Sequence, residues 1–196
     1  TCKKKESVDE DELVVFGIGG ADDGKNYASV RCGWKLKSGQ LLEDIEKKNG
    51  VKIFTTDNQG SYIACGWLMH VRAGDFLGHP SGLIDDQRFS EPWNLPRDQL
   101  LTLRKLPAAF LPHGVMGNST SQPLWDTTDG KFGPFRGQVL VGDVQNGRLS
   151  RICLEKVGGE YQGAAIPFIY NRFGGGVNRL IFDQSGVLWV GFTGRG

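Results

Sequence analysis

The sequence lacks an excess of either charge. It holds 23 lysine and arginine residues against 22 aspartate and glutamate residues, so its formal net charge is +1. Proteins that bind nucleic acid through general attraction to phosphate groups carry a clear basic excess. No apolar run in the sequence comes near the roughly 20 residues that a membrane-spanning helix needs. The composition therefore predicts no nucleic-acid partner and no membrane span.

Metal-binding and thiol redox motifs are also missing. Four cysteines are present, but no Cys-x-x-Cys or Cys-x-x-Cys-His segment occurs. Zinc ribbons, thioredoxin chemistry and covalent haem attachment therefore have no support in this sequence. Cys32 and Cys65 both lie in apolar, strand-like stretches, where they either form a disulfide or remain small buried thiols.

Glycine, in contrast, is abundant. The 29 glycines amount to about twice the ordinary usage of ~7%. Because glycine allows the positive φ angles that tight turns need, this abundance predicts many such turns. The sequence also holds 11 phenylalanines, 5 tryptophans and 4 tyrosines, residue types that favour strands. The sequence predicts an all-β fold and argues against a helical bundle.

Residues 1–12 are predicted to form a flexible polar leader, followed by β-structure over residues 13–196. Within the leader, Cys2 is followed by a run of charged residues. This arrangement is typical of a bacterial lipoprotein after its signal peptide has been removed, and it predicts a periplasmic or extracellular protein anchored through Cys2. Because Thr1 precedes the cysteine, an ordinary frayed terminus is the alternative.

Apolar stretches separated by turn residues indicate where the strands lie. The predicted strands are residues 13–18, 27–36, 51–56, 62–71, 138–141, 148–154, 178–182 and 187–192. Residues 41–48 have helical spacing and predict either a single helical turn or a polar connection. Residues 99–105 predict a short helix or an irregular connector, and residues 107–134 a long loop or pair of loops.

Three junctions share one pattern, in which an apolar strand is followed by a polar turn that ends in glycine and then by another apolar strand. The turns end at Gly50, Gly147 and Gly186, and the last two glycines are 39 positions apart. This distance fits a repeat of about 40 to 50 residues, as found in the blades of β-propellers.

Several short motifs together resemble one family of β-propellers. They include Asp57-Asn58-Gln59-Gly60, Leu111-Pro112-His113-Gly114, Lys131 to Gln138 (KFGPFRGQ) and Glu160-Tyr161-Gln162-Gly163. This set resembles the six-bladed glucose/sorbosone dehydrogenase class, whose best-known member uses pyrroloquinoline quinone. It is most similar to the large secreted propeller proteins of planctomycete-like bacteria. The resemblance extends from about Val51 to Gly196.

The sequence departs from this family in two ways. The Arg-Asn-Pro segment that usually precedes the strand ending at Asp57 is absent, since Leu42 to Lys48 occupy its place. Six blades also require on the order of 250 to 350 residues at 40 to 50 residues each. The chain is long enough for about three or four blades, so the resemblance implies a partial six-bladed-type propeller and a fragment of a larger protein.

The resemblance implies roles for five residues around a central channel. Asp57 and Asn58 would hold Ca²⁺ or the polar substrate, and His113 would act as the base that removes a hydroxyl proton from a sugar. Gln59 and Arg179 would contact the anionic cofactor pyrroloquinoline quinone. Three of these residues also have a structural alternative: Asp57 could cap an Asx-turn, His113 could pack under a blade, and Arg179 could pair with Glu155 or Asp183.

Other polar residues predict structural roles. His79, which precedes a proline, is predicted to hold a connection between blades, and His70 falls within a strand. Asp126 and Asp129 are predicted to cap a turn, with Ca²⁺ binding as the weaker alternative, because the loop lacks the EF-hand pattern. Asp143 is predicted to bond to a turn.

The predicted function is that of an exported β-propeller that binds a carbohydrate or polyol and oxidises it with a bound quinone and Ca²⁺. The alternative is a non-catalytic module of a larger envelope protein that binds carbohydrate or protein. A third possibility is that the chain belongs to a multidomain electron-transfer protein whose haem domain, or whose remaining blades, lie beyond Gly196.

Overall fold

The fold is described from a computed structural model, which describes residues 14–17, 53–57, 65–72, 74–170 and 172–194. Most regular elements in these residues are β-strands, so the predicted all-β class is confirmed. Several predictions lie outside the described residues: the leader with Cys2, the strand at 27–36, the segment at 41–48, and the site residues Asn58 and Gln59.

The first sheet contains four strands in the order β1-β2-β3-β4. Their bounds are β1 Val14–Gly17, β2 Ile53–Asp57, β3 Cys65–Val71 and β4 Ala109–Pro112. β1 runs parallel to β2, and the other pairs are antiparallel. The central strand β3 is buried on both faces, with Trp67, Leu68 and Met69 each at most 1% exposed. A near-continuous apolar sequence therefore forms this strand, rather than an alternating one.

The second sheet is an antiparallel meander of four strands that pair in chain order. Its strands are β5 Thr120–Trp125, β6 Val139–Asp143, β7 Arg148–Val157 and β8 Glu160–Ile169. Gly158 and Gly159 join β7 to β8 with φ angles of 59° and 90°. Positive φ at both central positions is the type I′ turn geometry, which matches the twist of the strands on either side.

A two-stranded antiparallel hairpin forms the third layer. It consists of β9 Gly176–Phe182 and β10 Leu188–Thr193. Asp183 closes its turn by accepting hydrogen bonds from the backbone N–H groups of Ser185 at 2.9 Å and Val187 at 3.0 Å. An aspartate at the start of a turn is expected to bond in this way.

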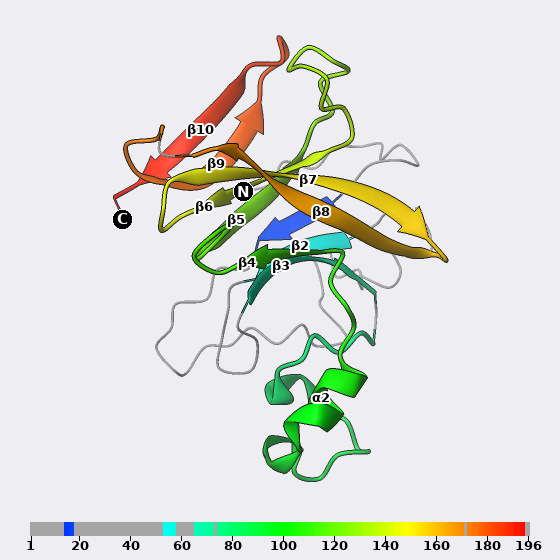
Figure 1. Cartoon of the computed structure of the whole chain (residues 1–196). Coiled ribbons are helices and arrows are strands. Elements are labelled where there is room, and N and C mark those ends of the chain that lie inside the picture. Colours follow the sequence, from blue (N-terminus) through cyan, green and yellow to red (C-terminus); the bar gives the residue numbers. More distant parts are fainter. Residues whose placement is uncertain (1–13, 18–52, 58–64, 73, 171, 195–196) are drawn as a thin grey trace, which may run out of the picture.

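The three layers stack face to face in the order in which they occur along the chain (Figure 1). Side chains alternate along β6, so Val139 and Val141 pack with the first sheet whereas Leu140 packs with the hairpin. The first core includes Phe54, Leu68, Ala109, Leu111, Met116, Val139, Val141 and Ile152. The second core includes Leu140, Leu149, Val177 and Leu180. The second sheet is therefore buried on both faces.

The strands also keep the same order across the layers. The first strand of the meander, β5, lies against β1 and β2 on one side and against β9 on the other. Its last strand, β8, lies against β4, the last strand of the first sheet. The strands β1, β2, β5 and β9 therefore gather along one side of the stack, whereas β4 and β8 lie along the other.

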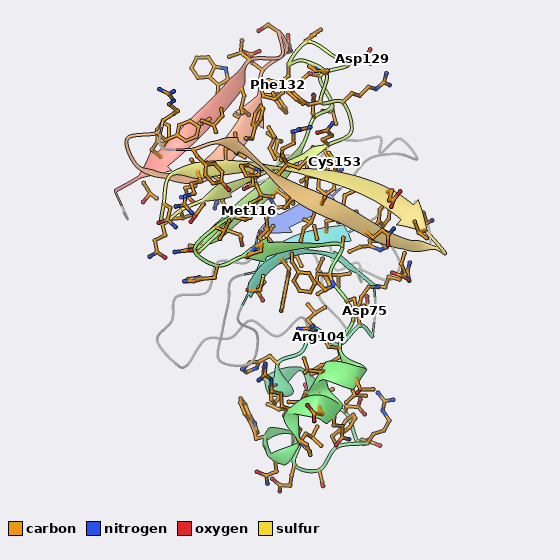
Figure 2. All side chains as sticks on the ribbon, viewed as in Figure 1. Asp75, Arg104, Met116, Asp129, Phe132 and Cys153 are labelled. Carbon is orange, nitrogen blue, oxygen red and sulfur yellow. The ribbon has the colours of Figure 1, made fainter. Side chains whose placement is uncertain are left out.

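A lobe of short helices projects from the first sheet between β3 and β4 (Figure 1). It contains the 3-10 turns η1 Pro80–Leu83 and η2 Pro92–Asn94 and the helix α2 Arg97–Leu103. Figure 2 shows Asp75 and Arg104 where the lobe joins the sheets. Lys105 bridges this junction, because its Nζ lies 2.8 Å from a carboxylate oxygen of Asp75 and 3.4 Å from one of Glu160 on β8. No helix among the described residues has the length and apolar character to cross a membrane.

The structure corrects two sequence predictions. Residues 107–134, predicted as loops, contain β4 and β5, and the predicted strands did not include β8. The sequence did not predict β5 because Pro123 lies inside this strand, and proline usually indicates a loop. β5 is an edge strand whose pairing with β6 is irregular between Thr120 and Pro123, and an irregular edge is where a strand tolerates proline. Of the two alternatives for residues 99–105, the helix is correct.

Candidate functional site

Two of the predicted site residues lie at one edge of the first sheet. β2 and β4 both run antiparallel to β3, so they end at the same edge: Asp57 pairs with Trp67 and Pro112 with Cys65. His113 follows Pro112 directly. Two strand spacings of about 4.8 Å separate β2 from β4, and His113 lies about three residues, or about 10 Å, farther along the strand direction than Asp57, so their backbones are about 14 Å apart.

The connection between β4 and β5, residues 113–119, forms a loop at this edge; we call it the edge loop. Its own groups hold part of it in place. The backbone N–H of Met116 donates to the carbonyl oxygen of Pro112 at 2.8 Å, and that of Gly114 donates to Oδ1 of Asn118 at 2.5 Å. Gly114 has a φ of 78°, a conformation that glycine adopts without strain.

The turn between β6 and β7 fixes the other end of the edge loop. Asp143, at the end of β6, is 1% exposed. Its two carboxylate oxygens accept hydrogen bonds from the backbone N–H groups of Asn118 and Ser119, each at 3.2 Å. They also accept from the N–H of Gln145 and from Nδ2 of Asn146, both at 2.9 Å. Asp143 thus bonds to its own turn, as predicted, and in addition to the edge loop.

Side chains from β7 hold the middle of the edge loop. Arg148 donates from Nη1 to the carbonyl oxygens of Gly114 at 2.8 Å and Val115 at 3.1 Å. Its guanidinium lies over the ring of Tyr170, 5.2 Å from the centroid. Ser150, on the same face of β7, donates from Oγ to the carbonyl oxygen of Met116 at 3.2 Å. Figure 2 shows Met116 where the first and second sheets meet.

The edge loop therefore presents the His113 side chain, which is exposed, on a backbone held from three directions. An imidazole in this position can accept a proton or a hydrogen bond from a hydroxyl group. Cys65 lies beside the same segment, and its thiol interacts with the backbone of Leu111 and His113. Burial raises the pKa of this thiol, so it remains protonated at neutral pH and is no nucleophile. Cys65 and Cys153 are both free thiols.

Asp57 is exposed at the end of β2, and its backbone is tied to the second sheet. Thr120 donates from Oγ1 to the carbonyl oxygen of Asp57 at 3.1 Å, and Thr56 donates to the carbonyl oxygen of Ser121 at 2.7 Å. Within the residues that the structure covers, no group of three or more His, Cys, Asp or Glu side chains could hold a metal ion. The Ca²⁺ site at Asp57 and Asn58 stays a prediction.

Arg179 lies apart from this edge. On β9 the side chains of Val177 and Leu180 pack against the second sheet, whereas Arg179 is exposed on the opposite face of the hairpin. Its Nη1 donates to the backbone carbonyl and to Oδ1 of Asn178, at 3.1 and 3.2 Å. In the described part of the chain, neither Glu155 nor Asp183, the two alternative partners predicted for Arg179, forms an ion pair with it. The second sheet separates Arg179 from the edge loop, and its cofactor role stays a prediction.

Of the residues predicted to be structural, Asp126 caps its turn as predicted, whereas His79 and Asp129 make local contacts other than the predicted ones. His79 caps η1: its Nδ1 accepts a hydrogen bond from the backbone N–H of Ser81 at 3.3 Å. Asp126 caps its loop through Oδ1, which accepts from the backbone N–H of Thr128 at 2.9 Å and from its hydroxyl at 2.6 Å. Asp129 pairs with Arg136 at 2.8 Å.

No feature of the sequence predicts that His70 is unusual. Its side chain is 5% exposed, both ring nitrogens lack a hydrogen-bond partner, and the ring packs 5.0 Å from the rings of Phe54 and Tyr161. Burial, reinforced by the charges of Arg72 and Lys105, lowers its pKa to about 4. His70 lies toward the end of β3 farthest from Asp57, in the core rather than at the candidate site.

No protein-family model, curated protein or solved structure matches the chain. The resemblance to the glucose/sorbosone dehydrogenase class therefore rests on the sequence motifs alone.

Proposed function

We propose that this chain is an exported, partial six-bladed-type β-propeller that binds a carbohydrate or polyol at the edge formed by Asp57 and the edge loop. The observation that carries the proposal is the fixed edge loop, which presents His113 on the same edge as Asp57. Export to the periplasm or cell exterior, with or without a lipid on Cys2, is part of the proposal and follows from the resemblance.

The stacking of the layers supports the propeller. In a propeller, each blade is a four-stranded antiparallel meander, and consecutive blades pack face to face with their first strands around a common axis. The second sheet is such a meander, and its first strand lies beside β1 and β2 and beside β9. On this interpretation the antiparallel strands β2, β3 and β4 belong to one blade, the meander is a second, and the hairpin is the beginning of a third; β1, which runs parallel to β2, does not fit the blade pattern.

The connections support a ligand site at this edge. The edge loop joins the last strand of one layer to the first strand of the next, and the turn at Asp143 joins the two middle strands of the meander. These connections meet through the hydrogen bonds of Asp143 and Arg148. Loops that are fixed before binding lose little conformational entropy when a ligand arrives, so a rigid edge favours affinity.

The chemistry of the edge suits hydroxyl groups. A carboxylate on Asp57 accepts hydrogen bonds, and the His113 imidazole both accepts and donates them. When a sugar alcohol is oxidised, His113 is the group at this edge that takes the hydroxyl proton. Pyrroloquinoline quinone, when bound, would accept the two electrons and the remaining hydrogen of the alcohol carbon.

Isothermal titration with a panel of monosaccharides and polyols tests the proposal. We expect binding by the wild-type chain and weaker binding by His113→Phe, which keeps a ring but forms no hydrogen bond with a hydroxyl group, by about five-fold if one hydrogen bond of about 1 kcal/mol is lost. His79→Phe, at a histidine of the lobe, is the matched control and should bind like the wild type. The proposal fails if no member of the panel binds, or if both variants bind as the wild type does.

A second measurement separates catalysis from recognition. The chain is loaded with Ca²⁺ and pyrroloquinoline quinone, and dye reduction is followed with each sugar that binds. Reduction that His113→Gln abolishes supports the oxidation step. Sugar binding without reduction supports the alternative, a non-catalytic carbohydrate-binding module, and removes the proton-transfer role of His113.

A further inference from the structure

Three cations gather where the lobe joins the sheets, and one of them has no acidic partner. Arg72 pairs with Glu160, and Lys105 pairs with Asp75 and Glu160. Arg104, which lies at the same junction (Figure 2), forms no ion pair within the described residues, and its Nε is buried without a hydrogen-bond partner. A half-buried arginine whose charge no protein group compensates is suited to bind an anion.

Arg104 lies beside the edge that presents His113. Cys65 pairs with Pro112, the residue before His113, and its thiol interacts with the backbone of His113. The positive charge of Arg104 acts on the same thiol, where it opposes the effect of burial on the pKa of Cys65. Because the interaction between charges weakens with distance and with exposure to water, the guanidinium lies near this thiol. The lobe therefore adds a cation to the edge.

The face of the first sheet that turns toward the lobe carries an aromatic row. Directly paired residues share a face, so Asp57, Trp67 and Phe110 form one row across β2, β3 and β4. Trp67 belongs to a small cluster that packs with Leu77 at the start of the lobe, and Cys65 lies on its face of β3. The Phe110 side chain is 44% exposed, and the buried Nε1 of Trp67 has no hydrogen-bond partner. An exposed ring between polar groups offers a surface for the apolar side of a sugar ring.

We propose that Arg104 makes this edge selective for sugars that carry an anionic group, either a carboxylate or a phosphate. The inference rests on the proposed carbohydrate function of the edge and adds the class of sugar to it. The planar guanidinium donates two parallel hydrogen bonds to the oxygens of such a group. The sugar ring packs on Phe110, and its hydroxyl groups face His113 and Asp57.

The charges at the edge orient such a ligand. Two strand spacings of about 4.8 Å separate Asp57 on β2 from Phe110 on β4, and Arg104 acts at the β4 side. The Debye length at physiological ionic strength is about 8 Å, so an anionic group held at Arg104 is largely screened from the Asp57 carboxylate. The anionic end of the sugar therefore points to Arg104, and its hydroxyl end points to Asp57.

Isothermal titration of the full chain with matched sugars at physiological salt measures the selectivity. Each pair differs at carbon 6 alone: glucose against glucuronate, glucose against glucose 6-phosphate, and galactose against galacturonate. We expect the wild-type chain to bind the anionic member of a pair at least about ten-fold more tightly than the neutral one, because hydrogen bonds to charged groups are the stronger ones. Whether the carboxylate or the phosphate binds more tightly identifies the anionic group.

Arg104→Met retains an apolar stem and removes the charge, so the two members of each pair should bind this variant equally well. Arg104→Lys keeps the charge but not the two parallel hydrogen bonds, and it should retain part of the selectivity. Arg97→Met is the matched control, because it removes the same charge from the exposed start of α2, about 10 Å from Arg104, and it should keep the wild-type selectivity.

The ratio of the two affinities separates selection by charge from a purely structural role. If Arg104 only held the lobe in place, its replacement would weaken both members of a pair by the same factor and leave their ratio unchanged. Equal binding of neutral and anionic sugars by the wild type, or selectivity that persists in Arg104→Met, would overturn the inference and leave the proposed function intact. Failure of every sugar to bind would instead overturn the proposed function, and the inference with it.

Discussion

The backbone N–H of Asn118 donates a hydrogen bond to the Asp143 carboxylate at 3.2 Å, although the two residues are 25 positions apart. This bond and its neighbour from Ser119 join the edge loop to the β6–β7 turn. Because this buried carboxylate accepts hydrogen bonds from four N–H groups, these bonds offset the free-energy cost of removing its charge from water. The candidate site is thus held by one acidic group that touches both of its connections.

Asp143→Ala should be among the most destabilising single substitutions in the chain. It leaves four N–H groups without an acceptor at a position that is 1% exposed. Each unsatisfied buried group costs about 1–3 kcal/mol, partly relieved by water entry, so we expect a loss of about 3–4 kcal/mol. Urea denaturation measures it. Asp129→Asn, which removes the charge of an exposed carboxylate paired only on the surface and keeps a residue type that tolerates the φ of 58° at this position, is the control and should change stability by less than about 1 kcal/mol.

Arg148→Met should loosen the edge loop without unfolding the protein. Methionine retains an apolar stem against Tyr170 but cannot donate to the carbonyl oxygens of Gly114 and Val115. We expect faster hydrogen exchange in residues 113–117 and a loss of stability of about 1–2 kcal/mol. Exchange followed by mass spectrometry reports the loop directly. Unchanged protection of these amides would show that the arginine does not hold the loop.

Gly176→Ala should disrupt the contact between the hairpin and the second sheet. A Cβ on Gly176 would lie 1.6 Å from the carbonyl oxygen of Val144, so the backbone must move. Gly174→Ala is a matched control two residues away, because a Cβ there meets nothing within 4 Å. We expect the first variant to lower the free energy of unfolding by more than about 2 kcal/mol and the second by less than about 1 kcal/mol. Equal effects would contradict this packing.

The sequence predicted most of the strands because their signals are local. Turn residues such as Asn146-Gly147 interrupt apolar runs, and β6, β7, β9 and β10 follow from that pattern alone. β8 gave no such signal. Its residues are all exposed or half-buried, because it is an edge strand of the meander, and their burial does not alternate regularly along the strand. The local sequence pattern also failed to predict β5, because Pro123 favoured a loop at this position.

The candidate site was predictable only in part. His113 and Asp57 follow apolar strands, and a loop after a strand is where polar site residues are expected. The sequence could not show that Asp143, Arg148 and Ser150 hold the edge loop, because these contacts depend on how two sheets pack. For Arg179 the sequence interpretation pointed to a site that the structure does not support. The glycine run before this arginine suggested that it binds an anion in the channel, but Arg179 lies on the exposed face of β9, opposite to the buried Leu180.

His70 should make the protein sensitive to mild acid. Its pKa is about 4 in the folded state, against an ordinary value of 6.5, because burial disfavours the charged ring. The unfolded chain therefore binds a proton more readily, and stability should be full above pH 6.5 and fall as the pH drops from there toward 4. Arg72 and Lys105 add to this effect, whereas Glu160 and Asp75 oppose it. Urea denaturation across this range, with His70→Phe as the test variant, measures the dependence.

Phenylalanine keeps the ring contacts with Phe54 and Tyr161 and removes two nitrogens that lack partners. Because an unpartnered buried polar atom costs free energy, His70→Phe should be at least as stable as the wild type at neutral pH. Between pH 6.5 and 4, the free energy of unfolding of the variant should also depend less steeply on pH, by an amount that corresponds to at most one proton bound on unfolding. Proton NMR of the wild-type ring should show a midpoint near 4. If the variant and the wild type lose stability in parallel, groups other than His70 bind the proton, and the buried neutral ring has no part in the acid response.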